Sequence, residues 1–195
     1  MTRTATTDHP IDEALANRWS PRAFSDRPAE EAVVASLFEA ARWSPSASNL
    51  QPWGFVHTAR GTTDFERLRG CLAPPNALWA GKAALLVLAL ADPAKPDGTP
   101  NLHARYDLGQ AVAHLTFQAS SLGLHVHQMA GFDPAAARTA MNIPPHLEIV
   151  SAVAIGYLGE AEILPPALQE RERAIRTRKP AGSFVFRDRW PDAAA

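Results

Sequence analysis

Two arginines and a serine lie at alternate positions in the segment Arg18-Trp19-Ser20-Pro21-Arg22. Pro21 favours an extended conformation for the residue before it and has no amide hydrogen of its own, so this segment is not predicted to be helical. Side chains at positions i, i+2 and i+4 of an extended chain face the same way. Two guanidinium groups and a hydroxyl would therefore face one point, where they could bind phosphate oxygens. Taken alone, the segment is also typical of a solvent-exposed basic turn.

A second polar segment, residues 44–53 with the sequence SPSASNLQPW, joins a predicted helix directly to a predicted strand. Asn49 and Gln51 each offer a hydrogen-bond donor and an acceptor, the pairing that recognises the edge of a heteroaromatic ring. Taken alone, the segment is equally typical of a turn-rich connection.

A third segment, Arg176-Thr177-Arg178-Lys179-Pro180, places two more arginines at alternate positions. These arginines would also face one way in an extended chain, although a solvated run of charge is the ordinary interpretation. His125 and His127 share one face of a predicted strand, but two histidines without neighbouring acidic residues or cysteines do not predict a metal site. His103 and Tyr106 border a loop and either contact a substrate or are only surface residues.

Length and charge restrict the class of protein. The 195 residues fit one domain and could bury roughly 70% of the unfolded surface. The 19 basic and 20 acidic residues produce a net charge of -1, which predicts no nucleic-acid or membrane partner, so a phosphate would have to be bound locally. The chain contains a single cysteine, Cys71, which excludes an internal disulfide. The longest apolar run, residues 83–91, has about half the length that a membrane-spanning helix needs. We therefore expect a cytoplasmic protein.

Apolar periodicity predicts helices that alternate with strands. Residues 92–106 contain three prolines and a glycine, which indicates a surface loop long enough to act as a lid. Gly109, inside the longest predicted helix, indicates close packing by a helix or a ligand. Helices are predicted at 11–15, capped by Asp8, from Pro28 to before Ser44, at 65–69, at 106–122 and after Asp133; strands are predicted at 53–58, at 83–91 in the centre of a sheet, at 124–130 and at 149–155.

Together, segments 18–22 and 44–53 resemble the signatures of the nitroreductase family of FMN-dependent oxidoreductases. The resemblance implies an α+β fold, in which helices flank a mixed, largely antiparallel sheet. It also implies an intertwined homodimer with two FMN sites at the interface. Residues 1–195 would form a single FMN-binding domain, and residues 160–195 a C-terminal extension that packs on the partner subunit.

The resemblance also assigns roles to individual residues. The first segment would hold the flavin phosphate and the polar edge of the ring, and the second would line the flavin of the neighbouring subunit. Backbone amides of residues 128–131 would approach the flavin N5 and O4, while Asn76 would either reach the ribityl chain or only cap a helix. The residues implied to bind FMN are Arg18, Trp19, Ser20, Arg22, Pro45, Ser46, Ala47, Asn49, Gln51, Asn76, Gln128, Met129, Ala130, Gly131, Arg176 and Arg178.

The implied activity is reduction of a small-molecule acceptor, such as a nitroaromatic or a quinone, by NADH or NADPH. Hydride would pass through the flavin N5 in a ping-pong mechanism, so no side chain is predicted to be catalytic. Four alternatives stay open: a reductive dehalogenase, a flavin-consuming enzyme, a flavin-storing or flavin-sensing protein without turnover, and a flavin-free structural dimer. Motifs of serine hydrolases, P-loop NTPases and Rossmann dehydrogenases are absent from the sequence.

Overall fold

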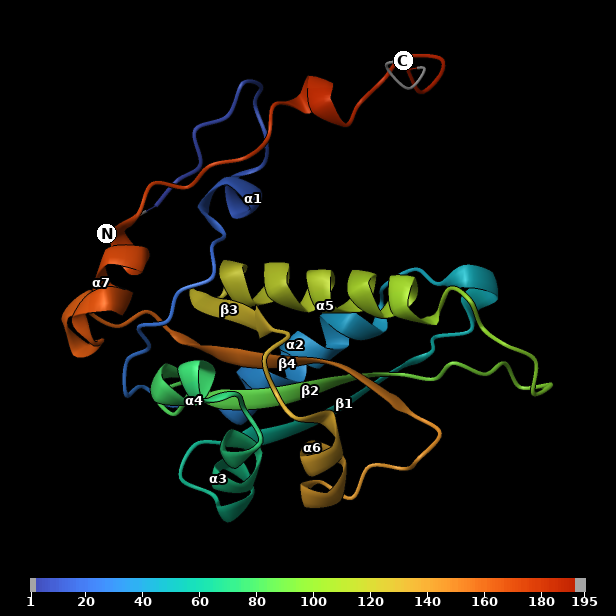
Figure 1. The fold of residues 1–195 in the computed structure, drawn as a ribbon, viewed down its shortest axis with the longest axis horizontal. Coiled ribbons are helices and arrows are strands. Elements are labelled where there is room, and N and C mark those ends of the chain that lie inside the picture. The colour runs from blue at the N-terminus through green and yellow to red at the C-terminus, as the bar shows by residue number, and fades with distance from the viewer. Residues whose placement is uncertain (1–2, 192–195) are drawn as a thin grey trace.

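The computed structural model describes residues 3–191, which form a four-stranded sheet covered by helices (Figure 1). The strands are β1 (Trp53–Ala59), β2 (Leu85–Ala91), β3 (Leu124–Met129) and β4 (Glu148–Tyr157), in the order β1-β2-β4-β3. All three pairings are antiparallel. The predicted α+β class is confirmed, and the part of the sheet that residues 3–191 form contains no parallel pair.

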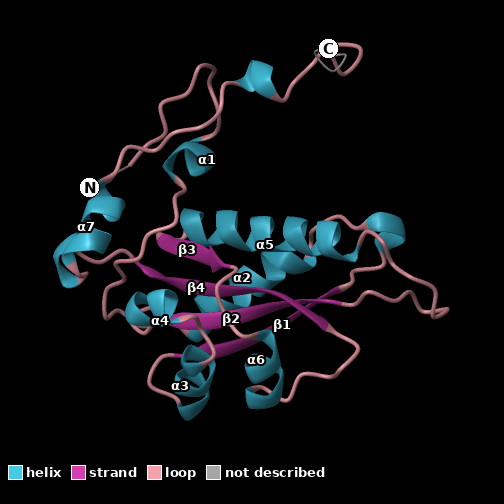
Figure 2. Cartoon of the chain, in the orientation of Figure 1, coloured by secondary structure: helices cyan, strands magenta, loops and turns pink. Residues whose placement is uncertain are grey.

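Strand β2 is central, as its uninterrupted apolar sequence predicts, and all seven of its residues are buried. Leu86 and Leu88 pack in one core with α3 (Thr63–Gly70), α4 (Pro74–Ala80) and α6 (Pro134–Ala140). Leu85 and Val87 pack in another core with α2 (Glu31–Arg42) and α5 (Ala104–Ser121). Both faces of the sheet are therefore covered, as Figure 2 shows.

The two long helices follow their apolar stripes. Helix α2 buries Val34, Leu37 and Ala41, which are spaced by three and four residues. Helix α5 begins at Ala104, two residues before its predicted start, and ends before Gly123, whose φ of 76° suits glycine. The predicted cap of α6 is confirmed, because the Asp133 carboxylate accepts hydrogen bonds from the amides of residues 135 and 136.

The start predicted for the first helix is wrong. Helix α1 spans Glu13–Asn17 and is capped by Asp12, whose Oδ1 accepts from the Ala14 amide at 2.8 Å, rather than by Asp8. Either aspartate can cap a helix, but Asp12 directly precedes the residues that become helical.

Two helices were not predicted from the sequence, α4 and α7 (Pro166–Arg173). Each begins with proline, which suits the first helical position because the amide there has no partner within the helix. A proline pair therefore resembles a loop in the sequence and starts a helix in the fold. Short 3₁₀ turns lie at Ala47–Asn49 (η1), Ala161–Ile163 (η2) and Ala181–Ser183 (η3).

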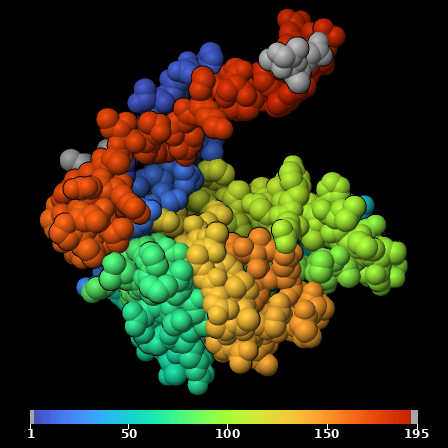
Figure 3. All heavy atoms as spheres, in the orientation of Figure 1, coloured from blue at the N-terminus to red at the C-terminus, as the bar shows by residue number. Residues whose placement is uncertain are grey.

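Residues 3–17 and the segment after α7 lie side by side and project from the globular part (Figure 3). The Arg176 guanidinium joins these two arms, donating to the carbonyls of Ala16 at 2.9 Å and Arg18 at 2.8 Å. Apolar side chains on the C-terminal arm are exposed to solvent: Phe184 is 58% exposed and Trp190 is 72% exposed. The arm therefore lacks a core of its own, and packing of residues 160–195 on a partner stays a prediction, with residues 192–195 outside the described chain. No helix within residues 3–191 has the length and apolarity needed to cross a membrane.

Candidate functional site

The segment 18–22 lies between the projecting arms and the globular part. Arg18 has extended backbone angles, and its Nη1 donates to the Ser20 Oγ at 3.3 Å. The two side chains therefore face the same way, as their alternate positions predict. Arg22 points elsewhere, with its Nη1 3.9 Å from a carboxylate oxygen of Glu172.

Three guanidinium groups, those of Arg3, Arg18 and Arg178, lie near the guanidinium of Arg176. Burial and the charge of Arg178 lower the pKa of Arg18. Burial, and then the charges of the other three arginines, lower the pKa of Arg176. Within the described chain no carboxylate forms an ion pair with Arg18, Arg176 or Arg178. The cluster therefore repels itself and would be stabilised by an anion.

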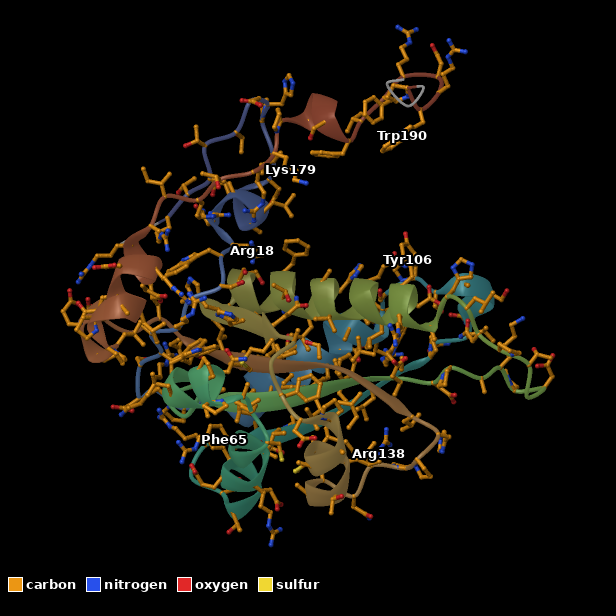
Figure 4. All side chains as sticks on the ribbon, viewed as in Figure 1. Arg18, Phe65, Tyr106, Arg138, Lys179 and Trp190 are labelled. Atoms are coloured by element: carbon orange, nitrogen blue, oxygen red, sulfur yellow. The ribbon has the colours of Figure 1, made fainter. Side chains whose placement is uncertain are left out.

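A cavity of about 480 Å³ adjoins this cluster and is lined by Arg18, Arg176, Arg178, Lys179 and residues of the N-terminal arm. Figure 4 shows Lys179 on the projecting arm above Arg18. The Arg176 guanidinium donates to backbone carbonyls, whereas Arg178 is exposed and, among the described residues, bonds only the carbonyl of its neighbour Thr177. Arg18 and Arg178 are consequently the arginines best placed to bind an anion here.

The segment 44–51 is held in a strained conformation. Ser48, Asn49 and Gln51 have φ values of 52°, 55° and 50°, in the left-handed region that non-glycine residues rarely adopt. The amide of Ala47 donates to the buried Asp107 carboxylate at 3.1 Å, and that of Gln51 donates to the Ser46 Oγ at 3.0 Å. Such strain persists only where neighbouring contacts enforce it, and it is frequent at ligand sites. Pro45, Asn49 and Gln51 are exposed, while Ser46 and Ala47 are half-buried.

A single chain does not bring these two segments together. Asp107, which holds the 44–51 segment, lies in the first turn of α5, whereas Ser120 in its last turn lines a cavity beside Trp19. The two positions are thirteen residues apart along the helix, which corresponds to about 20 Å. Figure 4 shows Arg18 and Tyr106 near opposite ends of α5.

Strand β3 packs against α5 and contacts the 18–22 segment. The Met129 side chain is in the core, 4% exposed, so only its backbone is available to a ligand, while Gln128 and Ala130 are exposed. Asn76 donates from its Nδ2 to the Gly131 carbonyl at 2.9 Å. A Cβ at Gly131 would lie 2.7 Å from that nitrogen, so any side chain there would displace Asn76.

The two histidines of β3 pack against tryptophan rings, as core residues do. His127 Nδ1 bonds the Pro21 carbonyl at 2.9 Å, and its ring lies 4.5 Å from that of Trp79. His125 lies edge-on to Trp19, with ring centroids 6.0 Å apart, and its buried Nδ1 has no partner among the described residues. Burial lowers the pKa of both rings. No set of three potential metal ligands occurs in the described part of the chain.

Two buried carboxylates that contact these segments were missed in the sequence. Asp107 lies on the apolar face of α5 between Ala104 and Leu108, and an acidic residue in an apolar stripe was a usable signal. Glu172 lies in the charged run ERER, which looks solvated, so the sequence contained no such signal. Residues 92–103 form an exposed loop in which only Asp92 and Asn101 are partly or fully buried, and His103 and Tyr106 are exposed surface residues.

The chain matches the family model described as "Nitroreductase family" over residues 15–70 and 72–157. A crystal structure described as an oxidoreductase containing FMN is similar over 98% of both chains, with 32% identity and a TM-score of 0.92. An uncharacterised 15.4 kDa protein of Mycolicibacterium smegmatis is 36% identical over 65% of this chain and 84% of its own length. A Streptomyces coelicolor protein, provisionally named NADH dehydrogenase/NAD(P)H nitroreductase, is 28% identical over 57% of this chain and 65% of its own.

Proposed function

The chain belongs to the nitroreductase family, and we propose on this basis that it is an FMN-dependent oxidoreductase that uses NADH or NADPH to reduce small acceptors such as nitroaromatics or quinones. The observation that carries the proposal is the cluster of arginines beside Ser20, which has no carboxylate partners for Arg18, Arg176 and Arg178 among residues 3–191 and fits a dianionic phosphate. FMN, when bound, supplies the hydride and electron transfer. Both substrates would use one open face of the cofactor in turn, hence a ping-pong mechanism.

The side chains of this protein would bind and orient the cofactor. Arg18, Ser20 and Arg178 would hold the phosphate, and the backbone of residues 129–131 would approach the ring, since Met129 is buried and Gly131 has no side chain. Asn76 would act from behind, by holding the Gly131 carbonyl at 2.9 Å. No titratable side chain is needed to move a proton at these positions.

A second copy of the chain would complete the site. Asn49 and Gln51 lie at the opposite end of α5 from Arg18, so the two groups can face one flavin only if they come from different subunits. Two α5 helices paired antiparallel about a two-fold axis would bring opposite ends together. A Cβ at Gly109 would meet no atom of its own chain within 4 Å, so the close packing predicted at this glycine does not occur within the subunit. We propose that Gly109 packs against the α5 helix of the partner instead. The exposed apolar arm offers the partner a further surface.

Anaerobic reduction of the purified protein tests the proposal. We expect a yellow dimer with about one FMN per chain, bleaching of the flavin by NADH or NADPH, and return of the colour when a nitroaromatic or quinone is added. A protein that retains FMN without being reduced would indicate flavin storage or sensing instead. A colourless protein that does not bind added FMN would contradict the proposal altogether.

Gly131→Val is expected to impair FMN binding or flavin reduction more than tenfold. The added Cβ would collide with Asn76 at 2.7 Å, and both the Gly131 peptide and its hydrogen bond would shift. Stopped-flow reduction by NADPH measures the effect.

His125→Ala and His127→Ala are the control substitutions for this experiment. Because neither ring is needed for hydride transfer, the reduction rate of bound flavin should stay within about tenfold of the parent rate. Normal rates in Gly131→Val together with a collapse in the histidine variants would show that the flavin does not lie against this segment.

A further inference from the structure

One peptide group of the 18–22 segment is held on both sides by side chains distant in sequence. The Pro21 carbonyl bonds His127 Nδ1 at 2.9 Å, and the Arg22 amide of the same peptide donates to Glu172 Oε1 at 2.8 Å. The same Glu172 oxygen accepts from the Ala23 amide at 3.0 Å. A carbonyl oxygen can only accept, so Nδ1 carries a proton, and burial, which lowers the pKa of this ring, favours the neutral Nδ1–H tautomer. The plane of this peptide is thereby fixed by β3 on one side and α7 on the other.

Glu172 differs from the other charged residues of its helix. It is 4% exposed, whereas Glu170, Arg171 and Arg173 are exposed. Its second oxygen, Oε2, has no hydrogen-bond partner in the described chain, and Arg22 Nη1 lies 3.9 Å away. Burying a carboxylate is costly unless its oxygens are satisfied. Two backbone amides of the 18–23 stretch are its main compensation, so its position favours holding that backbone rather than a surface ion pair.

Further contacts tie the same region to the C-terminal part of the chain. Arg3 donates to the backbone carbonyl of Glu172, and Arg176 donates to that of Arg18. Glu172 is therefore the buried member of a set of links that join α7 and its arm to the arginine segment. A segment held in its bound geometry loses less conformational entropy when a ligand binds.

We propose that Glu172 is a positioning residue for FMN. By fixing the Pro21–Arg22 peptide it sets the direction of the neighbouring Ser20 side chain, whose hydroxyl accepts from Arg18, so cofactor affinity depends on helix α7. This inference rests on the proposed function, because FMN is the ligand that the segment would hold.

Titration of the apoprotein with FMN, followed by quenching of flavin fluorescence, tests the proposal. Glu172→Ala leaves two amides without an acceptor and should weaken FMN binding at least about tenfold. Glu172→Gln keeps one oxygen for both amides and should stay within about threefold of the parent. Glu170→Ala, the same change on the exposed face of α7, should have no effect. Equal affinities of the Glu172→Ala variant and the parent would overturn the proposal.

A double-mutant cycle with Ser20→Ala separates positioning from a general loss of structure. If Glu172 acts by directing Ser20, Glu172→Ala should cost at most about threefold once the Ser20 hydroxyl is removed. An equal loss in both backgrounds would show a merely structural role. Should the alanine variant not fold, Glu172→Asp replaces it, because it withdraws the carboxylate from the amides by one methylene and should weaken FMN binding in the same way.

The parent protein distinguishes failure of this inference from failure of the proposed function. A parent that binds no FMN contradicts the proposed function and this inference with it. A parent that binds FMN tightly, together with a folded Glu172→Ala or Glu172→Asp variant of equal affinity, overturns the role of Glu172 alone.

Discussion

A chain truncated before Arg176 is expected to lose both bound FMN and the stable dimer. The truncation removes Arg178, removes the guanidinium that holds the Ala16 and Arg18 carbonyls, and removes the apolar side chains from residue 184 onward. Loss of Arg178 and of the Arg176 guanidinium removes positive charge from the phosphate site and loosens the 18–22 segment. Loss of the apolar side chains removes part of the surface that contacts the partner subunit. Flavin absorbance and light scattering on the same sample measure the two effects.

A shorter truncation after Gly182 is the control, because it retains Arg176, Arg178 and Lys179 while it removes Phe184 and Phe186. It should weaken the dimer more than it weakens the interactions with the phosphate. A stable, flavin-loaded monomer from the longer truncation would contradict the shared site.

Arg18→Ala is expected to weaken FMN binding about 10- to 150-fold, which corresponds to roughly 1.5–3 kcal/mol for one charge-assisted contact. Arg18 is half-buried, has no carboxylate partner among residues 3–191, and bonds Ser20 at 3.3 Å. Its charge is therefore both free for an anion and held in direction. Titration of the apoprotein with FMN measures the loss, and Arg178→Ala should produce a loss of the same order.

Arg171→Ala is the matched control for this pair. Arg171 is an exposed arginine of α7. Its removal changes the net charge equally but leaves the cluster intact, so FMN affinity should stay within about twofold. If Arg18→Ala and Arg178→Ala bound FMN as tightly as this control, the phosphate would have to lie elsewhere.

Local patterns determined much of the fold. The apolar run of β2, the stripe of Val34, Leu37 and Ala41, and the cap at Asp133 depend only on neighbours in sequence, and each forms the predicted element. The same holds for Arg18 and Ser20, whose alternate positions direct both side chains one way. The choice between Asp8 and Asp12 as a cap, and the helices that begin with proline, depended on packing that a local pattern does not contain.

The sequence by itself determined which residue types could form an anion site and which segments would be extended, because these properties follow from side-chain chemistry and backbone stereochemistry. Only the tertiary structure decided that Arg18 and Asn49 lie at opposite ends of α5, since that separation depends on how one helix lies across the sheet. It also decided that Glu172, in a run of charges that looks solvated, is buried against the amides of Arg22 and Ala23. Contacts between residues that are 150 positions apart produce no periodic pattern in the sequence of either partner, so only the tertiary structure shows them.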